Sequence, residues 1–151
     1  TKRDNIVQGL KATAALPFFY RDFVPYNDEL YLDGGLTDPI PYLKALEMGF
    51  KESEILVVLT RPKAYRKVRQ SFWVRTLYES YYKEPQYQLL LSAFEDQYQR
   101  YNQLLDDLEN RHRIDVIYPP ADFKVNRLTR NEAKILDGFE KGIKAAKAYL
   151  F

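Results

Sequence analysis

The sequence contains no cysteine, one histidine and six glycines among its 151 residues. Without cysteine the chain forms neither disulfides nor thiolate metal sites, and a single histidine is too few for a zinc site. We therefore expect no metal and no cofactor, and the lack of cysteine fits a reducing compartment. Six glycines are few for a complete hydrolase built on glycine loops, so the composition favours part of a larger protein.

Long apolar runs and a strong net charge are also missing. No apolar run approaches the length of a membrane span, and the N-terminus has no signal-peptide core. The net charge of +2 is too small to indicate a nucleic-acid partner. With 46% hydrophobic and 29% charged residues, the chain has a globular balance and the size of one domain. We expect a cytoplasmic protein that contacts the membrane, if at all, at its periphery.

One stretch combines the strongest structural signals with a candidate catalytic residue. Residues 30–32 predict a short buried strand, and Asp33 stands where that strand ends. Gly34 and Gly35 then allow a sharp turn and a close approach of the backbone. Helix-start signals follow, and an apolar helix is expected over residues 42–48.

The next apolar run, residues 55–59, is typical of a strand covered on both faces. Strand, turn, helix and strand together predict a parallel βαβ unit over about thirty residues. Ligands bind beyond the carboxyl ends of such strands, where Asp33 lies. The alternative is that Asp33-Gly34 forms a hairpin turn, although two prolines make the stretch after Gly35 a poor strand. From the residues alone, Asp33 is either catalytic or a turn-former.

Four blocks in order resemble the second half of a bacterial patatin-like phospholipase domain: Ala12-Thr-Ala-Ala-Leu-Pro17, Tyr31-Leu-Asp-Gly-Gly35, Asp38-Pro-Ile-Pro41 and Ile55-Leu-Val-Val-Leu-Thr60. The resemblance covers roughly residues 5–62. It implies an α/β fold with three α/β/α layers and parallel strands, and a lipid acyl hydrolase with a Ser-Asp dyad. By this resemblance Asp33 is the catalytic base, supported by Gly34 and Gly35 of its motif.

The chain departs from the family pattern at the nucleophile. None of its serines, Ser53, Ser71, Ser80 and Ser92, lies in a Gly-x-Ser-x-Gly sequence, and no glycine-rich oxyanion loop is present. We expect both features upstream in an intact parent protein that hydrolyses a lipid or a small ester. The 151-residue chain alone is predicted to be inactive, because a base needs its nucleophile within hydrogen-bond reach. The expected domains are residues 1–62, from the hydrolase, and residues 63–151, a helical extension.

Residues 63–83 predict a helix that carries aromatic and basic side chains. The basic residues could contact anionic lipid, and the alternative is a solvated helix face. The candidate lipid contacts are Arg61, Lys63, Arg66, Lys67 and Arg69.

The remaining chain predicts a second long helix over residues 85–110, which completes a helical hairpin, then a strand over 114–118 and a C-terminal helix from about 132. Thr129 and Glu132 are expected to form a capping box at the start of that last helix, which should close over the sheet. The apolar stripe of the hairpin predicts packing between helices, and self-association into a homo-oligomer is the alternative. The single histidine, His112, is expected at the surface.

An aromatic loop over residues 18–26 is expected to fill the core beneath the sheet edge, and the alternative is that it lines an acyl-chain cleft. Two functions of different classes remain open at this point. The first is the lipid acyl hydrolase. The second is a non-catalytic module that binds a membrane or a protein partner, in which the Asp-Gly-Gly turn is structural.

Overall fold

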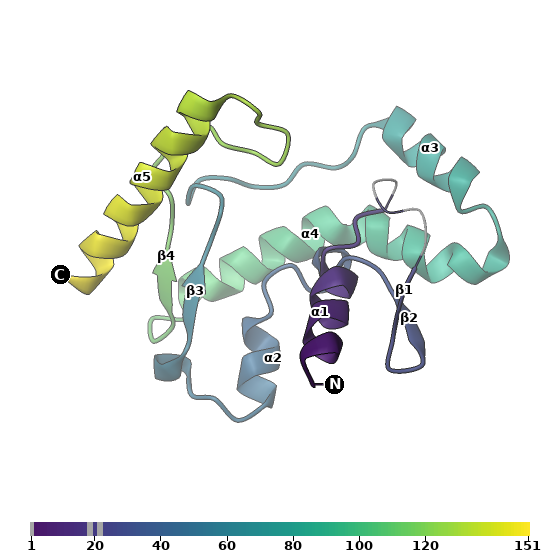
Figure 1. Cartoon of the computed structure of the whole chain (residues 1–151), viewed down its shortest axis with the longest axis horizontal. Helices are drawn as coiled ribbons and strands as arrows, with labels where there is room; N and C mark the ends of the chain where they lie inside the picture. Colours follow the sequence, from purple (N-terminus) through teal and green to yellow (C-terminus); the bar gives the residue numbers. More distant parts are fainter. Residues whose placement is uncertain (1, 18–19, 21–22) are drawn as a thin grey trace. The chain divides into compact units, whose positions relative to one another are not determined.

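The computed structural model describes residues 2–17, 20 and 23–151 (Figure 1). Contacts divide the chain into two compact units made of interleaved segments. Unit 1 comprises Thr1–Ile40 and Lys67–Leu104, and unit 2 comprises Pro41–Arg66 and Leu105–Phe151. The expected division into residues 1–62, from a hydrolase domain, and residues 63–151, a helical extension, stays a prediction.

Unit 1 begins with helix α1 (Lys2–Thr13), followed by the strands β1 (Val24–Tyr26) and β2 (Glu29–Tyr31). The two strands form an antiparallel hairpin in which Val24 pairs with Tyr31. Its two-residue turn is Asn27-Asp28, and both residues have positive φ, at 49° and 63°. Asn and Asp tolerate this left-handed conformation better than other non-glycine residues, which suits a tight hairpin turn.

This hairpin corrects the predicted βαβ unit. The strand before Asp33 pairs with β1, and the apolar strand β3 (Leu56–Val58) belongs to a different two-stranded sheet. The strand-to-helix turn itself is confirmed, because Asp33 leads into the 3-10 helix η1 (Gly34–Leu36) and then into helix α2 (Tyr42–Glu47). The hairpin signal therefore lies before β2, at Asn27-Asp28, and not at Asp33-Gly34.

Two small apolar clusters form the core of unit 1. One contains Ala12, Ala15 and Val24, and the other joins η1 to the helices α3 (Phe72–Tyr81) and α4 (Gln88–Asn110). Leu32 packs against both clusters. Aromatic rings dominate the second cluster, whose buried members are Leu36, Tyr78, Tyr82 and Phe94.

The helix predicted over residues 63–83 is shorter than expected, because α3 begins only at Phe72. A distant side chain explains the difference. Asn102 of α4 accepts a hydrogen bond from Lys67 N at 2.9 Å and donates one to Lys67 O at 3.0 Å. With both backbone groups of Lys67 bound in this way, the stretch before α3 cannot use them for helical hydrogen bonds.

The second long helix is confirmed with little change. The 3-10 turn η3 (Pro85–Tyr87) leads directly into α4. Pro85 suits this position because its fixed φ favours a helix start and its missing N–H would have no partner there. Among the described residues, no helix combines the length and the apolar character needed to cross a bilayer.

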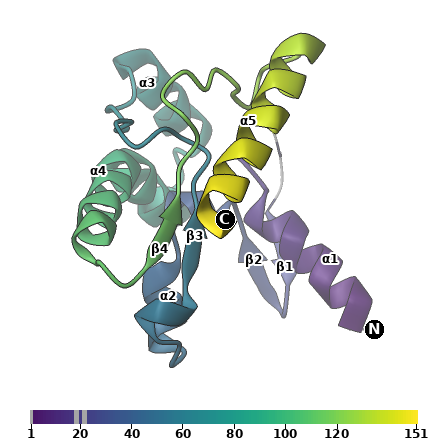
Figure 2. The same cartoon turned by 90° about the vertical axis from the view of Figure 1, so that its left-hand side faces the viewer.

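Unit 2 contains α2, β3, the strand β4 (Asp115–Ile117) and the C-terminal helix α5 (Glu132–Leu150). β3 and β4 lie side by side and parallel, with Val57 opposite Val116 (Figure 2). A parallel pair joined by a long crossover that contains helices is typical of α/β proteins. The α/β class is therefore supported.

Helix α5 differs from its prediction at its N-terminus. Asn131 caps the helix, because its Oδ1 accepts a hydrogen bond from Lys134 N at 3.0 Å. Thr129 instead accepts a hydrogen bond from Asn126 N, so the predicted capping box is wrong. A residue of either type is a good N-cap, and the local turn at Asn126 already uses Thr129.

Helix α5 packs on its own unit through an unexpected residue. Gly138 is the buried residue of the helix, and the side chains of Phe123 and Val125 lie against it. The hydroxyl of Tyr149 donates a hydrogen bond to Asp115 of β4 at 2.7 Å. Apolar residues that recur along α5 are exposed, among them Leu136, Phe139 and Leu150. The contact with the sheet that was expected of this helix is made at Tyr149, and these apolar residues lie at the surface.

Candidate functional site

The backbone at Asp33 is held on both sides. Asp33 N donates to Ala15 O at 3.0 Å, which ties the residue after β2 to the segment after α1. Leu36 N donates to Asp33 O at 3.2 Å and closes the first turn of η1. Asp33 therefore has a fixed place between a strand and a short helix.

The carboxylate of Asp33 caps η1. Its Oδ1 accepts a hydrogen bond from Gly35 N at 2.7 Å, and the side chain is half-buried. Gly35 N is the hydrogen-bond donor to this carboxylate among the described residues, and it bonds to Oδ1, so no described residue hydrogen-bonds Oδ2.

The two glycines after Asp33 are required by close contacts. A Cβ on Gly35 would lie 2.9 Å from Asp33 Oδ1, and a Cβ on Gly34 would lie 3.2 Å from Thr13 Oγ1. Both distances are shorter than ordinary van der Waals contact. The Asp-Gly-Gly sequence therefore lets the carboxylate fold back onto its own turn and lets the turn approach α1.

The end of the turn is anchored in the core of unit 1. Leu36 is buried among aromatic residues of α3 and α4. Its carbonyl accepts a hydrogen bond from Arg100 Nη1 of α4 at 3.0 Å. Sequence reasoning missed these contacts, which fix the position of the turn against α4.

A nucleophile beside the Asp33 carboxylate is absent from the described part of the chain. None of the four serines is among its hydrogen-bond partners. No group of three or more described His, Asp or Glu side chains is placed to hold a metal ion. His112 is exposed, as predicted. The site described here consists of one positioned carboxylate and its turn.

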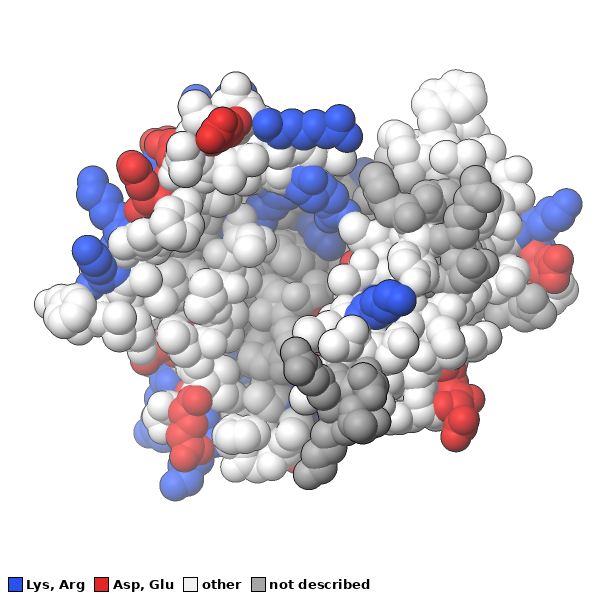
Figure 3. Space-filling view, in the orientation of Figure 1, with Lys and Arg blue, Asp and Glu red and all other residues white. Residues whose placement is uncertain are grey.

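The candidate lipid-contact residues are divided between the units. Arg61, Lys63 and Arg66 belong to unit 2, whereas Lys67 and Arg69 belong to unit 1. On the face in Figure 3, acidic side chains lie next to basic ones at the left and right edges of the view. We therefore describe the contacts of each of these basic residues separately.

Their contacts differ. The Arg66 guanidinium pairs with Asp106 at 3.0 Å and with Glu109 at 3.2 Å. The Lys67 ammonium lies over the Tyr101 ring, 4.9 Å from its centroid, and donates to Gln97. Arg61 lies over Tyr65 and Lys63 over Tyr118, at 5.2 and 5.9 Å. The Arg69 side chain is exposed.

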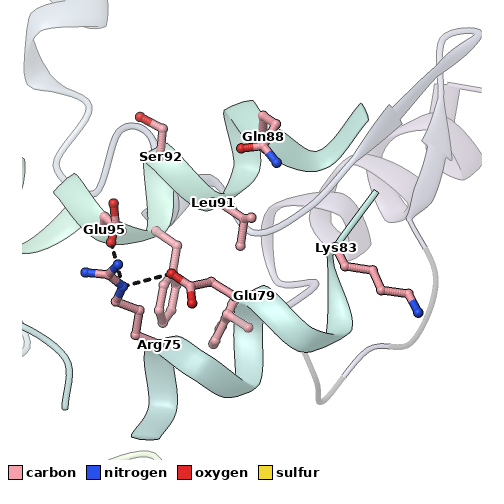
Figure 4. A pocket seen from close by; sticks show the side chains of 9 residues that line it. Arg75, Glu79, Lys83, Gln88, Leu91, Ser92 and Glu95 are labelled. Carbon is pink, nitrogen blue, oxygen red and sulfur yellow. Dashed lines mark hydrogen bonds and ion pairs between the residues drawn. The ribbon is translucent and has the colours of Figure 1, made fainter. Parts of the chain in front are cut away.

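A cleft of about 420 Å³ lies between α3 and α4 in unit 1 (Figure 4), and Asp33 is not among its lining residues. Its charged wall is internally paired, because Arg75 Nε lies 2.9 Å from Glu79 Oε1 and 3.0 Å from Glu95 Oε1. The rings of Tyr78 and Phe94 also line the cleft and stack on each other, with centroids 3.4 Å apart. Since its charges neutralise one another, we assign no ligand to this cleft.

Unit 2 contains a polar network that sequence reasoning also missed. The buried Tyr42 donates a hydrogen bond to Asp107 Oδ2 at 2.5 Å, and Arg111 Nε donates to the same oxygen at 2.7 Å. Arg111 also pairs with Glu52 at 2.8 Å. Burial and the hydrogen bond to Asp107 raise the pKa of Tyr42 well above its usual value. The hydrogen bonds from Arg111 and Tyr42 lower the pKa of Asp107.

The aromatic loop is only partly described. Phe18, Phe19, Arg21 and Asp22 lie outside the described residues, so the predicted role of that part of the loop stays a prediction. Of the described rings, Phe23 is half-buried and stacks on Tyr87 at a centroid distance of 5.8 Å. This contact is one between core elements of unit 1.

Comparison with known proteins gives two sequence matches. Residues 85–150 match a family model described as Domain of unknown function (DUF6363). The chain is also similar to the Uncharacterized protein YjjU of Escherichia coli (strain K12), with 30% identity over 121 residues. The match covers 78% of this chain and 32% of the relative, so the chain spans about a third of the length of that relative. No solved structure matches the chain.

Proposed function

We propose that Asp33 is the general base of a Ser-Asp lipid acyl hydrolase, and that the nucleophilic serine is contributed by a Gly-x-Ser-x-Gly segment of the longer parent protein. The single observation that supports this proposal is the Asp33 carboxylate itself. It stands at a strand end, one oxygen is held by Gly35 N, and the other is hydrogen-bonded by no described residue. A general base needs this combination of fixed orientation and a free acceptor.

The proposed reaction uses the open oxygen twice. In the first step Oδ2 of Asp33 takes the hydroxyl proton of the serine while the serine oxygen attacks the ester carbonyl, and the alcohol leaves with that proton. In the second step Asp33 takes a proton from a water molecule, which attacks the acyl-enzyme, and returns this proton to the serine oxygen as the carboxylic acid is released. No cofactor is needed for either step.

The proposed substrate is a lipid or a small carboxylic ester. This assignment rests on the resemblance of four sequence blocks to patatin-like phospholipases, which neither matched description names. The turn around Asp33 supports it, since Gly34 and Gly35 occupy positions where a side chain would clash.

The test is ester hydrolysis by the full-length protein carrying Asp33→Asn. Asparagine keeps an oxygen that can accept from Gly35 N, so the turn is retained while the base is lost. We expect kcat to fall by about 10²- to 10⁴-fold, the usual contribution of a general base. The assay is release of p-nitrophenol from short- and long-chain esters.

Asp38→Asn is the matched control, because Asp38 is an exposed carboxylate in the same loop. We expect Asp38→Asn to retain the wild-type rate. Full activity of Asp33→Asn would exclude Asp33 as the base. If the wild-type protein hydrolyses no ester at all, the non-catalytic binding module becomes the better function.

A further inference from the structure

The turn that carries Asp33 is tied to α4 by a charged side chain. The carbonyl of Leu36, the last residue of η1, accepts a hydrogen bond from Arg100 Nη1 at 3.0 Å. Leu36 N donates to Asp33 O at 3.2 Å, so the same residue closes the turn and binds Arg100. These residues all belong to unit 1. The guanidinium is therefore placed to fix the peptide at which the turn ends.

Arg100 differs from other guanidinium groups of the chain in what it binds. Arg66 and Arg111 each pair with two carboxylates. Within the described part of the chain Arg100 forms no ion pair, and its printed hydrogen bond goes to the backbone of the turn. The side chain is half-buried, and α4 carries no other basic residue. A charged donor forms a stronger hydrogen bond than a neutral one, so Leu36 O is held firmly.

The helix that presents Arg100 is itself fixed on both sides of this residue. Phe94 is buried in the aromatic cluster, and the buried Gln97, one turn before Arg100, donates to Phe94 O at 3.1 Å. Two residues after Arg100, Asn102 binds the backbone N–H and C=O of Lys67. A functional group is held more precisely by a rigid helix than by a loop.

The Asp33 carboxylate takes its orientation from the same turn. Its Oδ1 accepts a hydrogen bond from Gly35 N at 2.7 Å, and Gly35 lies between Asp33 and Leu36 in the chain. A shift of the Leu36 end of this short helix would therefore move Gly35 N and the carboxylate that it holds. Catalysis is sensitive to such shifts, because a misplacement of about 1 Å can cost about 10²-fold in rate.

We propose that Arg100 is a positioning residue for the base Asp33 and that α4 supports the candidate catalytic turn through it. This proposal rests on the hydrolase function proposed above. Arg100 acts through the turn and not on the substrate. It lies within residues 85–150, the segment matched by the family model of unknown function, so the contact gives the first α-helix of that segment a role.

The first test asks whether Arg100 holds the turn, and it does not depend on activity. Hydrogen–deuterium exchange of the full-length protein is followed by mass spectrometry on peptides that cover residues 30–41, which include hydrogen-bonded amides of the turn. Arg100→Met removes the donors and keeps an unbranched stem that can pack as the Arg stem does. We expect faster exchange in these peptides, because the turn opens more often without its anchor.

Asn102→Ala is the matched control for this test. It removes hydrogen bonds from the same helix, but these bonds go to Lys67 and not to the turn. We expect it to leave exchange over residues 30–41 and ester hydrolysis at the wild-type level at temperatures where the protein is folded.

The second test asks whether the turn is held for catalysis. In ester hydrolysis by the full-length protein, Arg100→Met should lower kcat by about 10- to 100-fold. KM should change by less than about twofold, because Arg100 does not bind the substrate. Arg100→Lys keeps a charged donor and should recover part of the rate.

The double variant with Asp33→Asn separates positioning from stability. Once the base is lost, Arg100→Met should cause no further loss of rate, because residues that act as a unit are not additive. Partial unfolding would instead lower the rate by the same factor in both backgrounds.

Three results would overturn the proposal: unchanged exchange over residues 30–41 in Arg100→Met, a wild-type kcat in that variant, or an equal loss of rate in both backgrounds. If Asp33→Asn still lowers kcat, each of these results leaves Asp33 as the base and removes only the role of Arg100. Full activity of Asp33→Asn would refute the proposed function and, with it, the positioning role.

Discussion

The packing of α5 can be measured with a pair of glycines in the same helix. A Cβ placed on Gly138 would lie 2.4 Å from Val125 Cγ2, which is about 1 Å inside ordinary contact, whereas a Cβ on Gly142 meets nothing within 4 Å. Gly142→Ala should therefore stabilise the protein by about 0.8–1 kcal/mol, the difference in helix propensity. Gly138→Ala gains the same propensity but incurs an overpacking cost of about 1–3 kcal/mol.

The expected result is a difference of about 1–3 kcal/mol in the free energy of unfolding between the two alanine variants. The assay is urea denaturation followed by far-UV circular dichroism, with equal slopes confirming that the same surface unfolds. Val125→Ala should rescue Gly138→Ala, because it removes the methyl group that the new Cβ would meet. The double-mutant cycle isolates this pairwise effect.

Equal stabilisation by Gly138→Ala and Gly142→Ala would refute the reasoning. It would mean that α5 does not rest on the segment that contains Val125. A failure of Val125→Ala to rescue would place the strain elsewhere, for example against Phe123, whose ring lies 3.4 Å from the same position.

Two further predictions concern polar contacts. Asp107→Asn should lower stability at pH 7 by about 1 kcal/mol. Because its pKa is lowered from 3.8 by Arg111 and Tyr42, this stabilisation is present above pH 3.8 and is lost as the pH falls through the lower folded-state pKa. The difference in urea midpoint between the wild type and Asp107→Asn should therefore be smaller at pH 3 than at pH 7, and an equal difference at both pH values would contradict the assignment. Asn102→Ala should lower the free energy of unfolding by about 1–3 kcal/mol, because the backbone N–H and C=O of the half-buried Lys67 lose the Asn102 side chain. Gln103→Ala, at an exposed neighbouring position, is the control. Equal effects of the two substitutions would exclude the proposed role of the Asn102 hydrogen bonds.

Elements with local signals were predictable from the sequence. The long helix α4 was predictable because its two signals are local. The apolar stripe lies within the helix itself, and the proline lies in the turn directly before it. The turn from β2 through Asp33 into η1 follows from two glycines and a helix start nearby. The position of the candidate site along the chain was therefore available from the sequence.

Elements that depend on distant partners were not predictable. The stretch before α3 is held open by Asn102, which lies 35 residues from Lys67. The anchoring of the Asp33 turn by Arg100 spans 64 residues. Strand pairing has the same character, since β3 pairs with β4 across more than fifty residues. The hairpin of β1 and β2 is different, because its turn residues Asn27 and Asp28 are local to the two strands, and the prediction missed them.

The measurement that tests the central claim most directly is the rate at which a fluorophosphonate ester modifies the full-length protein. This reagent reports the attacking serine and its base without the later hydrolysis step. The account predicts that Asp33→Asn slows modification by about 10²- to 10⁴-fold, while Asp38→Asn matches the wild type and the far-UV spectra coincide. Modification of Asp33→Asn at the wild-type rate would contradict the account and leave the Asp-Gly-Gly turn a structural feature.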